Sequence, residues 1–370
     1  MKNLAYLFIL LIVAAGCDKE EVQINTGPLL VSEMTYSGTD EGSGTDYTAM
    51  LAGTANSVPL DATFEIAFSK EVDPSTVNAT NIQLMKDGSV VNTNINTDGN
   101  VITISPASNL ERDATYNLQL SNDIKSIDGG IIAEAGNYSG ISRTINTVGE
   151  PPYVPDGQVA YWSFNFSYEE HLSGTMATEV GDPGFANTSK YGPNAFQSAS
   201  DSYLTFPADA LTNDEFSATF WYNVNATPNR AGILVMGPPD DTPPANNRTG
   251  GFRFFREAAG GNQRFKLNVG NGTADTWVDG GSDADVAPNS GWVHMAFTIS
   301  DTAAKVYING ELAKESDFSG VDWTGVDILS IGSGAPRFVQ WGHLSDQSYI
   351  DELRIFDVAL PQSEIQKMIE

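Results

Sequence analysis

A single cysteine, Cys17, occurs among the 370 residues, so no disulfide bond can form within the chain. Stability must therefore come from buried apolar side chains, and hydrophobic residues make up 41% of the sequence. Basic residues are also scarce: 19 Lys and Arg stand against 47 Asp and Glu, giving a net charge of −28. Such a chain repels nucleic acid and anionic lipid headgroups, which excludes nucleic acid as a partner.

Long apolar runs are confined to the N-terminus. Lys2 precedes the apolar residues 4–13, the small residues 14–16 and then Cys17. This pattern is typical of a secretory signal, and the run is shorter than the roughly 20 residues needed to span a bilayer. The alternative is an uncleaved anchor helix beside an incidental cysteine. The segment resembles a bacterial lipoprotein signal, which implies a signal peptide over residues 1–16 and lipidation of Cys17.

The residues after Cys17 indicate where the protein resides. Lys19, Glu20 and Glu21 resemble the surface-export signal of Bacteroidetes-type lipoproteins. The resemblance implies a lipid anchor in the cell outer membrane, with the protein exposed at the surface. Residues 17–29 are mostly polar and are predicted to form a lipidated tether.

Residues 30–147 lack helical periodicity and alternate apolar with polar residues. In residues 62–68, for example, Phe64, Ile66 and Phe68 share one face. Asp-Gly pairs, which favour hairpin turns, separate several such runs. The pattern predicts an all-β sandwich.

The same region resembles the bacterial Ig-like domain. The matching residues are the strand and F-S-x-x-V-D-P-like turn of residues 64–77, followed by Leu110 and residues 115–120. The resemblance implies a spacer or interaction module without catalysis. Residues 148–157 contain three prolines and are predicted to be a stiff linker.

Residues 158–370 are again all-β and richer in aromatic residues, and only residues 361–369 have a helical pattern. This region resembles laminin-G-like, concanavalin A-like jelly-roll domains. Three blocks carry the match, residues 192–222, 291–310 and 349–365. The fold expected for the whole chain is therefore an N-terminal Ig-like β-sandwich followed by a concanavalin A-like jelly-roll β-sandwich that acts as a lectin domain.

Related jelly-roll enzymes place acids on one strand as E-x-D-x-E. Here the only glutamates four residues apart are Glu311 and Glu315, with Ala313 between them. The sequence contains no G-x-S-x-G motif, and His294 is predicted to be a packed strand residue. We therefore expect no enzymatic activity, with a divergent glycoside hydrolase as the alternative.

Sugar-binding sites combine aromatic faces with planar polar groups. Trp162, Trp221 and Trp292 lie in strand-like segments and are predicted to be structural. The other three tryptophans lie in loop-like segments and are predicted to bind carbohydrate: Trp277, Trp323 and Trp341. The alternative is that each covers a small cluster beneath its own loop.

Residues 246–270 form a basic segment in an acidic chain. Arg253 and Arg256 flank two phenylalanines, and Arg248, Arg264 and Lys266 lie nearby with only Glu257 to balance them. Arg253 and Arg256 are predicted to line a groove and bind glycan hydroxyls or carboxylates. The alternative is that these side chains cover solvated strand faces.

No cofactor is required by any motif. In some relatives an acid on the closing strands helps to bind a structural Ca²⁺, and the resemblance puts Asp351 in that position. The alternative is a solvated surface acid.

Together these features predict an outer-surface glycan-binding lipoprotein that captures a polysaccharide for an uptake system, with an outer-membrane transporter as a partner. The acidic chain favours a neutral glycan over a sulfated one. The alternative from another class is an adhesin or structural surface protein that binds protein ligands.

Overall fold

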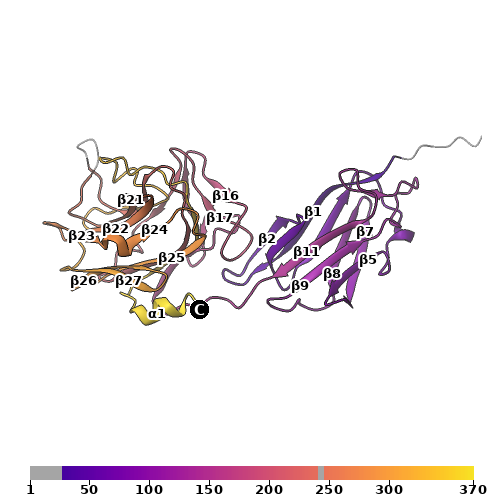
Figure 1. Ribbon diagram of the computed structural model, residues 1–370, viewed down its shortest axis with the longest axis horizontal. Helices are drawn as coiled ribbons and strands as arrows, with labels where there is room; N and C mark the ends of the chain where they lie inside the picture. The colour runs from indigo at the N-terminus through magenta and orange to yellow at the C-terminus, as the bar shows by residue number, and fades with distance from the viewer. Residues whose placement is uncertain (1–26, 241–245) are drawn as a thin grey trace, which may run out of the picture.

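The computed structural model describes residues 27–240 and 246–370, so Cys17 and the predicted export signal lie outside the described residues. Figure 1 shows two β-sandwiches joined end to end by the linker. The strands of the first sandwich run from Leu29 to Thr147, and those of the second from Gln158 to Phe356.

The first sandwich consists of two sheets. The β4 sheet has the order β10-β1-β4-β8-β7 with β2 paired to β1, and the β9 sheet has the order β3-β11-β9-β5-β6. A 3₁₀ turn, Pro74–Thr76, precedes β5. The strands are β1 (Leu29–Asp40), β2 (Thr45–Met50), β3 (Thr54–Val58), β4 (Thr63–Phe68), β5 (Ile82–Lys86), β6 (Ser89–Val91), β7 (Thr93–Asp98), β8 (Val101–Pro106), β9 (Thr115–Leu120), β10 (Ile132–Ala133) and β11 (Ile141–Thr147).

The second sandwich also consists of two sheets. The β19 sheet has the order β16-β17-β29-β19-β25-β26-β27 with β12 on β29, and the β21 sheet has the order β15-β18-β28-β20-β21-β22-β23 with β24 on β22. The strands of the β19 sheet are β12 (Gln158–Trp162), β16 (Gly184–Ala186), β17 (Ala195–Gln197), β19 (Phe216–Asn223), β25 (Trp292–Ile299), β26 (Ala303–Ile308), β27 (Glu311–Asp317) and β29 (Tyr349–Phe356). Those of the β21 sheet are β15 (Thr178–Val180), β18 (Tyr203–Pro207), β20 (Arg230–Met236), β21 (Phe252–Ala259), β22 (Asn262–Gly270), β23 (Asp275–Asp279), β24 (Asp285–Val286) and β28 (Ile328–Ile331).

Four short elements complete the second domain. β13 (Glu169–Glu170) and β14 (Thr175–Met176) form a separate hairpin, and a 3₁₀ turn spans Gly281–Ala284. The helix α1 (Gln362–Lys367) follows β29, and its Ile365 packs in a small apolar cluster with Tyr307. The helical pattern near the C-terminus is confirmed by α1.

Alternation along the strands fills each core. Phe64, Ile66 and Phe68 are buried between the sheets of the first domain, as their spacing predicts. In the second domain the core is aromatic, and the rings of Phe216, Phe252 and Phe297 pack against one another with centroids 5.0 to 5.8 Å apart. The all-β prediction with two sandwiches is confirmed. Within the described ranges, no helix has the length and apolar character needed to cross a membrane.

Candidate functional site

The outward face of the β21 sheet carries an unusual set of side chains. Because Phe252 and Phe254 point into the core, alternation turns Phe255 to the opposite face. The register β21–β22–β23 places Asn268 opposite both Arg253 and Trp277, so Trp277 belongs to this outward face. The loop after β28 covers Phe255 with Phe338, with ring centroids 5.3 Å apart.

Two of the three tryptophans that are predicted to bind carbohydrate are far apart in the sequence but lie side by side on this face. The ring centroids of Trp277 and Trp341 are 6.0 Å apart, and the residues are 38% and 37% exposed. Trp277 packs edge-on against Phe255 and Trp341 against Phe338, at 5.9 and 5.8 Å. The buried phenylalanines support both indoles, while part of each indole remains exposed.

Arg248 completes this cluster, which we call the tryptophan platform (Trp277, Trp341 and Arg248). Its guanidinium carbon lies 4.9 Å from the Trp341 centroid and 5.7 Å from that of Trp277, within cation–π range. One guanidinium nitrogen is 3.2 Å from a carboxylate oxygen of Asp275. Arg248 was part of the basic segment seen in the sequence but was not predicted as a site residue, because its role depends on two distant rings.

A network of charged groups borders the platform. Glu257 accepts a hydrogen bond from His343 Nε2 at 3.1 Å, and lies 3.1 Å from both Lys266 and Arg230. The His343 hydrogen bond and the two cations lower the pKa of Glu257 to about 2, while burial lowers that of His343. Lys266 also pairs with Asp279 at 3.0 Å. Arg230, Arg248 and Lys266 thus each have a carboxylate partner, and the basic patch is locally neutralised.

Burial corrects the prediction that Arg253 and Arg256 contact a glycan. Both are 0% exposed, and their spacing of three puts them on opposite faces of β21. Arg256 points inward, where one guanidinium nitrogen is 2.7 Å from Asp346 and Nε is 3.0 Å from Tyr222 Oη. Arg253 donates to the backbone carbonyl of Gly250 at 2.6 Å, and burial lowers its pKa to about 9. The guanidinium groups of both arginines are therefore bonded within the protein and closed to a ligand.

Trp323 is also corrected to a structural residue. Its ring packs on the core phenylalanines Phe216 and Phe252, with centroids 5.9 and 6.1 Å apart. Its Nε1 donates to the carbonyl of Asn213 at 2.7 Å. This is the arrangement expected of a tryptophan that covers a cluster beneath its loop.

Asp351 does not fit the calcium role. It is fully buried, and its Oδ2 accepts hydrogen bonds from the backbone N–H groups of Lys190 and Tyr191 at 2.6 and 3.0 Å. Burial, and then the neighbouring Glu352, raise its pKa. Ca²⁺ requires six to eight oxygen ligands. Although Asp351 Oδ1 has no partner, the adjacent Glu352 is engaged elsewhere, and no cluster of three His, Cys, Asp or Glu is arranged for a metal within the described residues.

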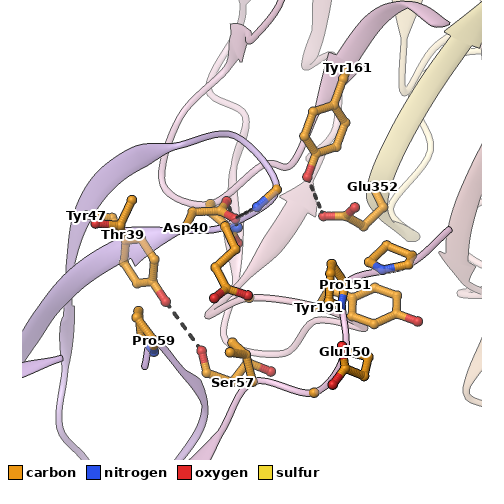
Figure 2. Close-up of a pocket in the computed structure, with 17 residues that line it drawn as sticks. Thr39, Asp40, Tyr47, Ser57, Pro59, Glu150, Pro151, Tyr161, Tyr191 and Glu352 are labelled. Atoms are coloured by element: carbon orange, nitrogen blue, oxygen red, sulfur yellow. Dashed lines mark hydrogen bonds between the residues drawn. The ribbon is translucent and has the colours of Figure 1, made fainter. Parts of the chain in front are cut away.

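Glu352 lines a cavity of about 70 Å³ between the two domains, shown in Figure 2. Tyr161 Oη donates to one of its oxygens at 2.9 Å, and Arg354 lies 2.7 Å from the other. The Arg354 guanidinium also lies 3.8 Å from the centre of the Tyr161 ring. Ligand pockets usually measure about 300–1,000 Å³. This cavity is too small for a sugar, and its acid is fully engaged, so the tryptophan platform remains the better candidate site.

Proteins similar to this chain occur among the solved structures. A comparison with curated proteins finds no match. Among solved structures 266 chains match. One is domain 4 of AbnA, a GH43 extracellular arabinanase from Geobacillus stearothermophilus, in complex with arabinotriose: 20% identity, TM-score 0.45, covering 58% of this chain and 98% of that one. Another is the receptor binding domain of botulinum neurotoxin C/D mosaic serotype: 17% identity, TM-score 0.40, covering 58% of this chain and 51% of that one.

Family models match both domains. Residues 48–142 match the model described as bacterial Ig-like domain, and residues 198–366 match that of the concanavalin A-like lectin/glucanases superfamily. The chain therefore carries a bacterial Ig-like domain followed by a domain of the concanavalin A-like lectin/glucanases superfamily.

Proposed function

We propose that this protein is a non-catalytic glycan-binding lipoprotein of the cell outer surface that captures a polysaccharide for an uptake system. The observation that carries the proposal is the tryptophan platform. Indole faces pack against the C–H surface of a sugar ring, and guanidinium groups donate to its hydroxyls. Trp277, Trp341 and Arg248 supply both kinds of contact at one place.

A neutral glycan suits this surface better than a sulfated one. Arg230, Arg248 and Lys266 are each paired with a carboxylate, so little positive charge is left to attract sulfate groups. The net charge of −28 adds a repulsive field at longer range. Sugar hydroxyls can form hydrogen bonds with both members of such an ion pair, whereas a sulfate group would compete with the carboxylate for the cation.

The chemistry beside the platform supports binding without catalysis. A glycosidase needs a carboxylic acid that is still protonated at working pH. Glu257 borders the platform, but its pKa of about 2 keeps it ionised, and three cationic or hydrogen-bonding groups hold it. It is therefore poorly suited to protonate a glycosidic oxygen.

The proposed location rests on Cys17 with Lys19, Glu20 and Glu21, which lie outside the described residues. The Ig-like domain then acts as a spacer between the lipid anchor and the lectin domain. An antibody to the lectin domain should label intact cells, and Cys17→Ala should release the protein from the membrane. Wild-type protein found only in the periplasm would contradict the surface location.

Binding is tested by affinity gel electrophoresis with a panel of neutral soluble polysaccharides. At least one should retard the wild-type protein, and Trp277→Ala and Trp341→Ala should each weaken binding by about 1–3 kcal/mol, the usual cost of a lost aromatic anchor. Leu312→Ala is the control, because Leu312 is 41% exposed on the opposite sheet. Equal retardation of all four proteins would move the site away from the platform.

Two further outcomes separate the alternatives. Release of reducing sugar from any retarding polysaccharide would replace binding with hydrolysis as the function. Absence of retardation across the panel, together with saturable binding to a surface protein, would favour an adhesin.

A further inference from the structure

A second, larger hollow lies between the two domains. Its volume is about 680 Å³, within the range of ligand pockets. One wall is formed by Met50, Thr54 and Asn56 of the Ig-like domain, and the other by Phe166 and the loop 187–193 of the lectin domain. We propose that this interdomain groove is a second binding site for a neutral saccharide chain, separate from the tryptophan platform and complete only when both domains are docked.

The lining of the groove matches a neutral polyhydroxylated ligand. It contains no Asp or Glu among the described residues, although the chain has 47 of them. Lys190 is its only charged residue, and the ammonium group lies 4.2 Å from the centre of the Trp221 ring. The remaining polar residues carry amide and hydroxyl groups, which can form hydrogen bonds with the hydroxyls of an uncharged sugar.

Exposed apolar and polar groups occur together in the groove. Phe166 is 46% exposed and Met50 is 62% exposed, one on each wall. Asn187 and Thr188 are also exposed, and their side chains make no hydrogen bond to any residue in the described ranges. An aromatic face beside unengaged amide and hydroxyl groups is the combination that binds a sugar ring.

The lectin wall is held rigid. Phe166 has a φ of +55°, a strained value for a residue with a side chain, and its backbone N–H donates to the buried Asn194 at 2.9 Å. The buried Asp351 accepts hydrogen bonds from the backbone N–H groups of Lys190 and Tyr191, which fixes this part of the loop. Gly192, with a φ of +68°, leaves room for the Asn165 side chain, which a Cβ at this position would overlap. Preorganised walls reduce the entropy lost when a ligand binds.

Direct contact between the domains fixes the width of the groove. Asn165 Nδ2 donates to Asp40 Oδ2 at 2.5 Å, which joins the lectin domain to the end of β1. The Tyr47 and Phe166 rings also lie 6.5 Å apart across the same junction. The two walls therefore keep their spacing before any ligand arrives.

The test uses residues 18–370, which omit the predicted signal peptide and Cys17, with ¹³C-labelled methionine methyl groups. Cellohexaose, maltohexaose, laminarihexaose and xylohexaose are the probes, added to millimolar concentration. At least one should shift the Met50 methyl resonance saturably, while that of Met176, 57% exposed and outside the groove, stays in place. Met50→Leu assigns the signal. No Met50 shift with any of the four probes would overturn the proposal.

Variants then locate the ligand. Phe166→Ala and Asn187→Ala should each weaken the interaction that shifts Met50 by about tenfold. Because the Phe166 ring also contacts Tyr47 across the junction, Phe166→Ala should in addition keep the wild-type radius of gyration, which excludes undocking as the cause. The double variant Trp277→Ala/Trp341→Ala should leave the Met50 shift unchanged, which separates this site from the platform. A Met50 shift that depends on the two tryptophans, or that hexagalacturonate produces equally well, would contradict the proposal.

Discussion

The loop tryptophans differ in what their indole rings touch. Trp323 packs against two core phenylalanines and donates its N–H to a backbone carbonyl, whereas Trp277 and Trp341 rest edge-on against a small outer cluster and keep part of each ring exposed. An aromatic side chain contributes to binding only where its face is left open. The same distinction applies to the arginines, because Arg248 lies over the exposed rings while Arg256 is buried beneath the sheet.

Arg256 is expected to determine stability. Arg256→Ala leaves Asp346 buried without its cation, and breaking such a pair costs about 3–5 kcal/mol. Arg264→Ala is the matched control: Arg264 pairs with Asp285 but is partly exposed, so its loss should cost far less. Urea denaturation followed by intrinsic fluorescence measures both. Comparable losses for the two variants would show that the Arg256 network does not stabilise the fold.

His294 is expected to make stability depend on pH. Burial, and then Lys190, lower its pKa from 6.5 to about 3, so the folded state keeps it neutral while the unfolded state binds a proton below pH 6.5. Its contribution to the free energy of unfolding should therefore fall by about 1.4 kcal/mol per pH unit as the pH drops from 6.5 toward 3. His294→Leu should therefore show a smaller decrease in the free energy of unfolding between pH 7 and pH 5 than the wild type, as measured by denaturation curves at the two pH values. An unchanged slope would contradict the assignment.

At the scale of elements, the helical spacing in residues 361–369 predicted α1, and the family resemblance predicted the jelly-roll fold of the second domain. Strand alternation predicted the first sandwich and the all-β character of the second. It could not predict which strands pair across the platform: β22 brings β23 and Trp277 beside β21, and the irregular segment after β28 brings in Trp341. Loops have no periodicity from which their path can be derived. The contact of Arg248 with the rings of Trp277 and Trp341 could not be predicted for the same reason. In contrast, the spacing of three between Arg253 and Arg256 was sufficient to predict that their side chains lie on opposite faces of a strand.

The loop 187–193 is expected to depend on Asp351. Asp351→Ala removes the acceptor for the N–H groups of Lys190 and Tyr191 and should release the loop, so trypsin should cut faster after the exposed Lys190. Asp327→Ala is the control, because Asp327 is exposed and pairs with Arg337 elsewhere.

The same digestion tests the calcium role of Asp351. Since two backbone N–H groups hold this carboxylate, adding Ca²⁺ or a chelator should leave both the cleavage rate of the wild type and its melting temperature unchanged. Protection by Ca²⁺ would restore calcium as the partner of the unpaired Asp351 Oδ1.

At the scale of the whole molecule, the linker is fastened at both ends. On the Ig-like side, Arg112 donates to the carbonyl of Gly149 at 2.8 Å, and on the lectin side Tyr153 donates to Glu364 of α1 at 2.6 Å. Together with the Asn165–Asp40 contact, these bonds hold the two domains in one arrangement. A docked pair of domains presents the platform at a fixed distance from the first sandwich and keeps the interdomain groove open.

Gly42 tests this docking because it lies against the second domain. A Cβ at Gly42 would lie 2.7 Å from Tyr161 Oη, so Gly42→Val should push the β1–β2 turn away from the second sandwich. Small-angle X-ray scattering should then give a larger radius of gyration than for the wild type. Gly53→Val is the control, since nothing lies within 4 Å of a Cβ built there.

Polysaccharide binding at the platform should persist in Gly42→Val while the Met50 response in the groove is lost, because only the groove needs both domains. An unchanged radius of gyration would show that the turn yields without undocking the domains.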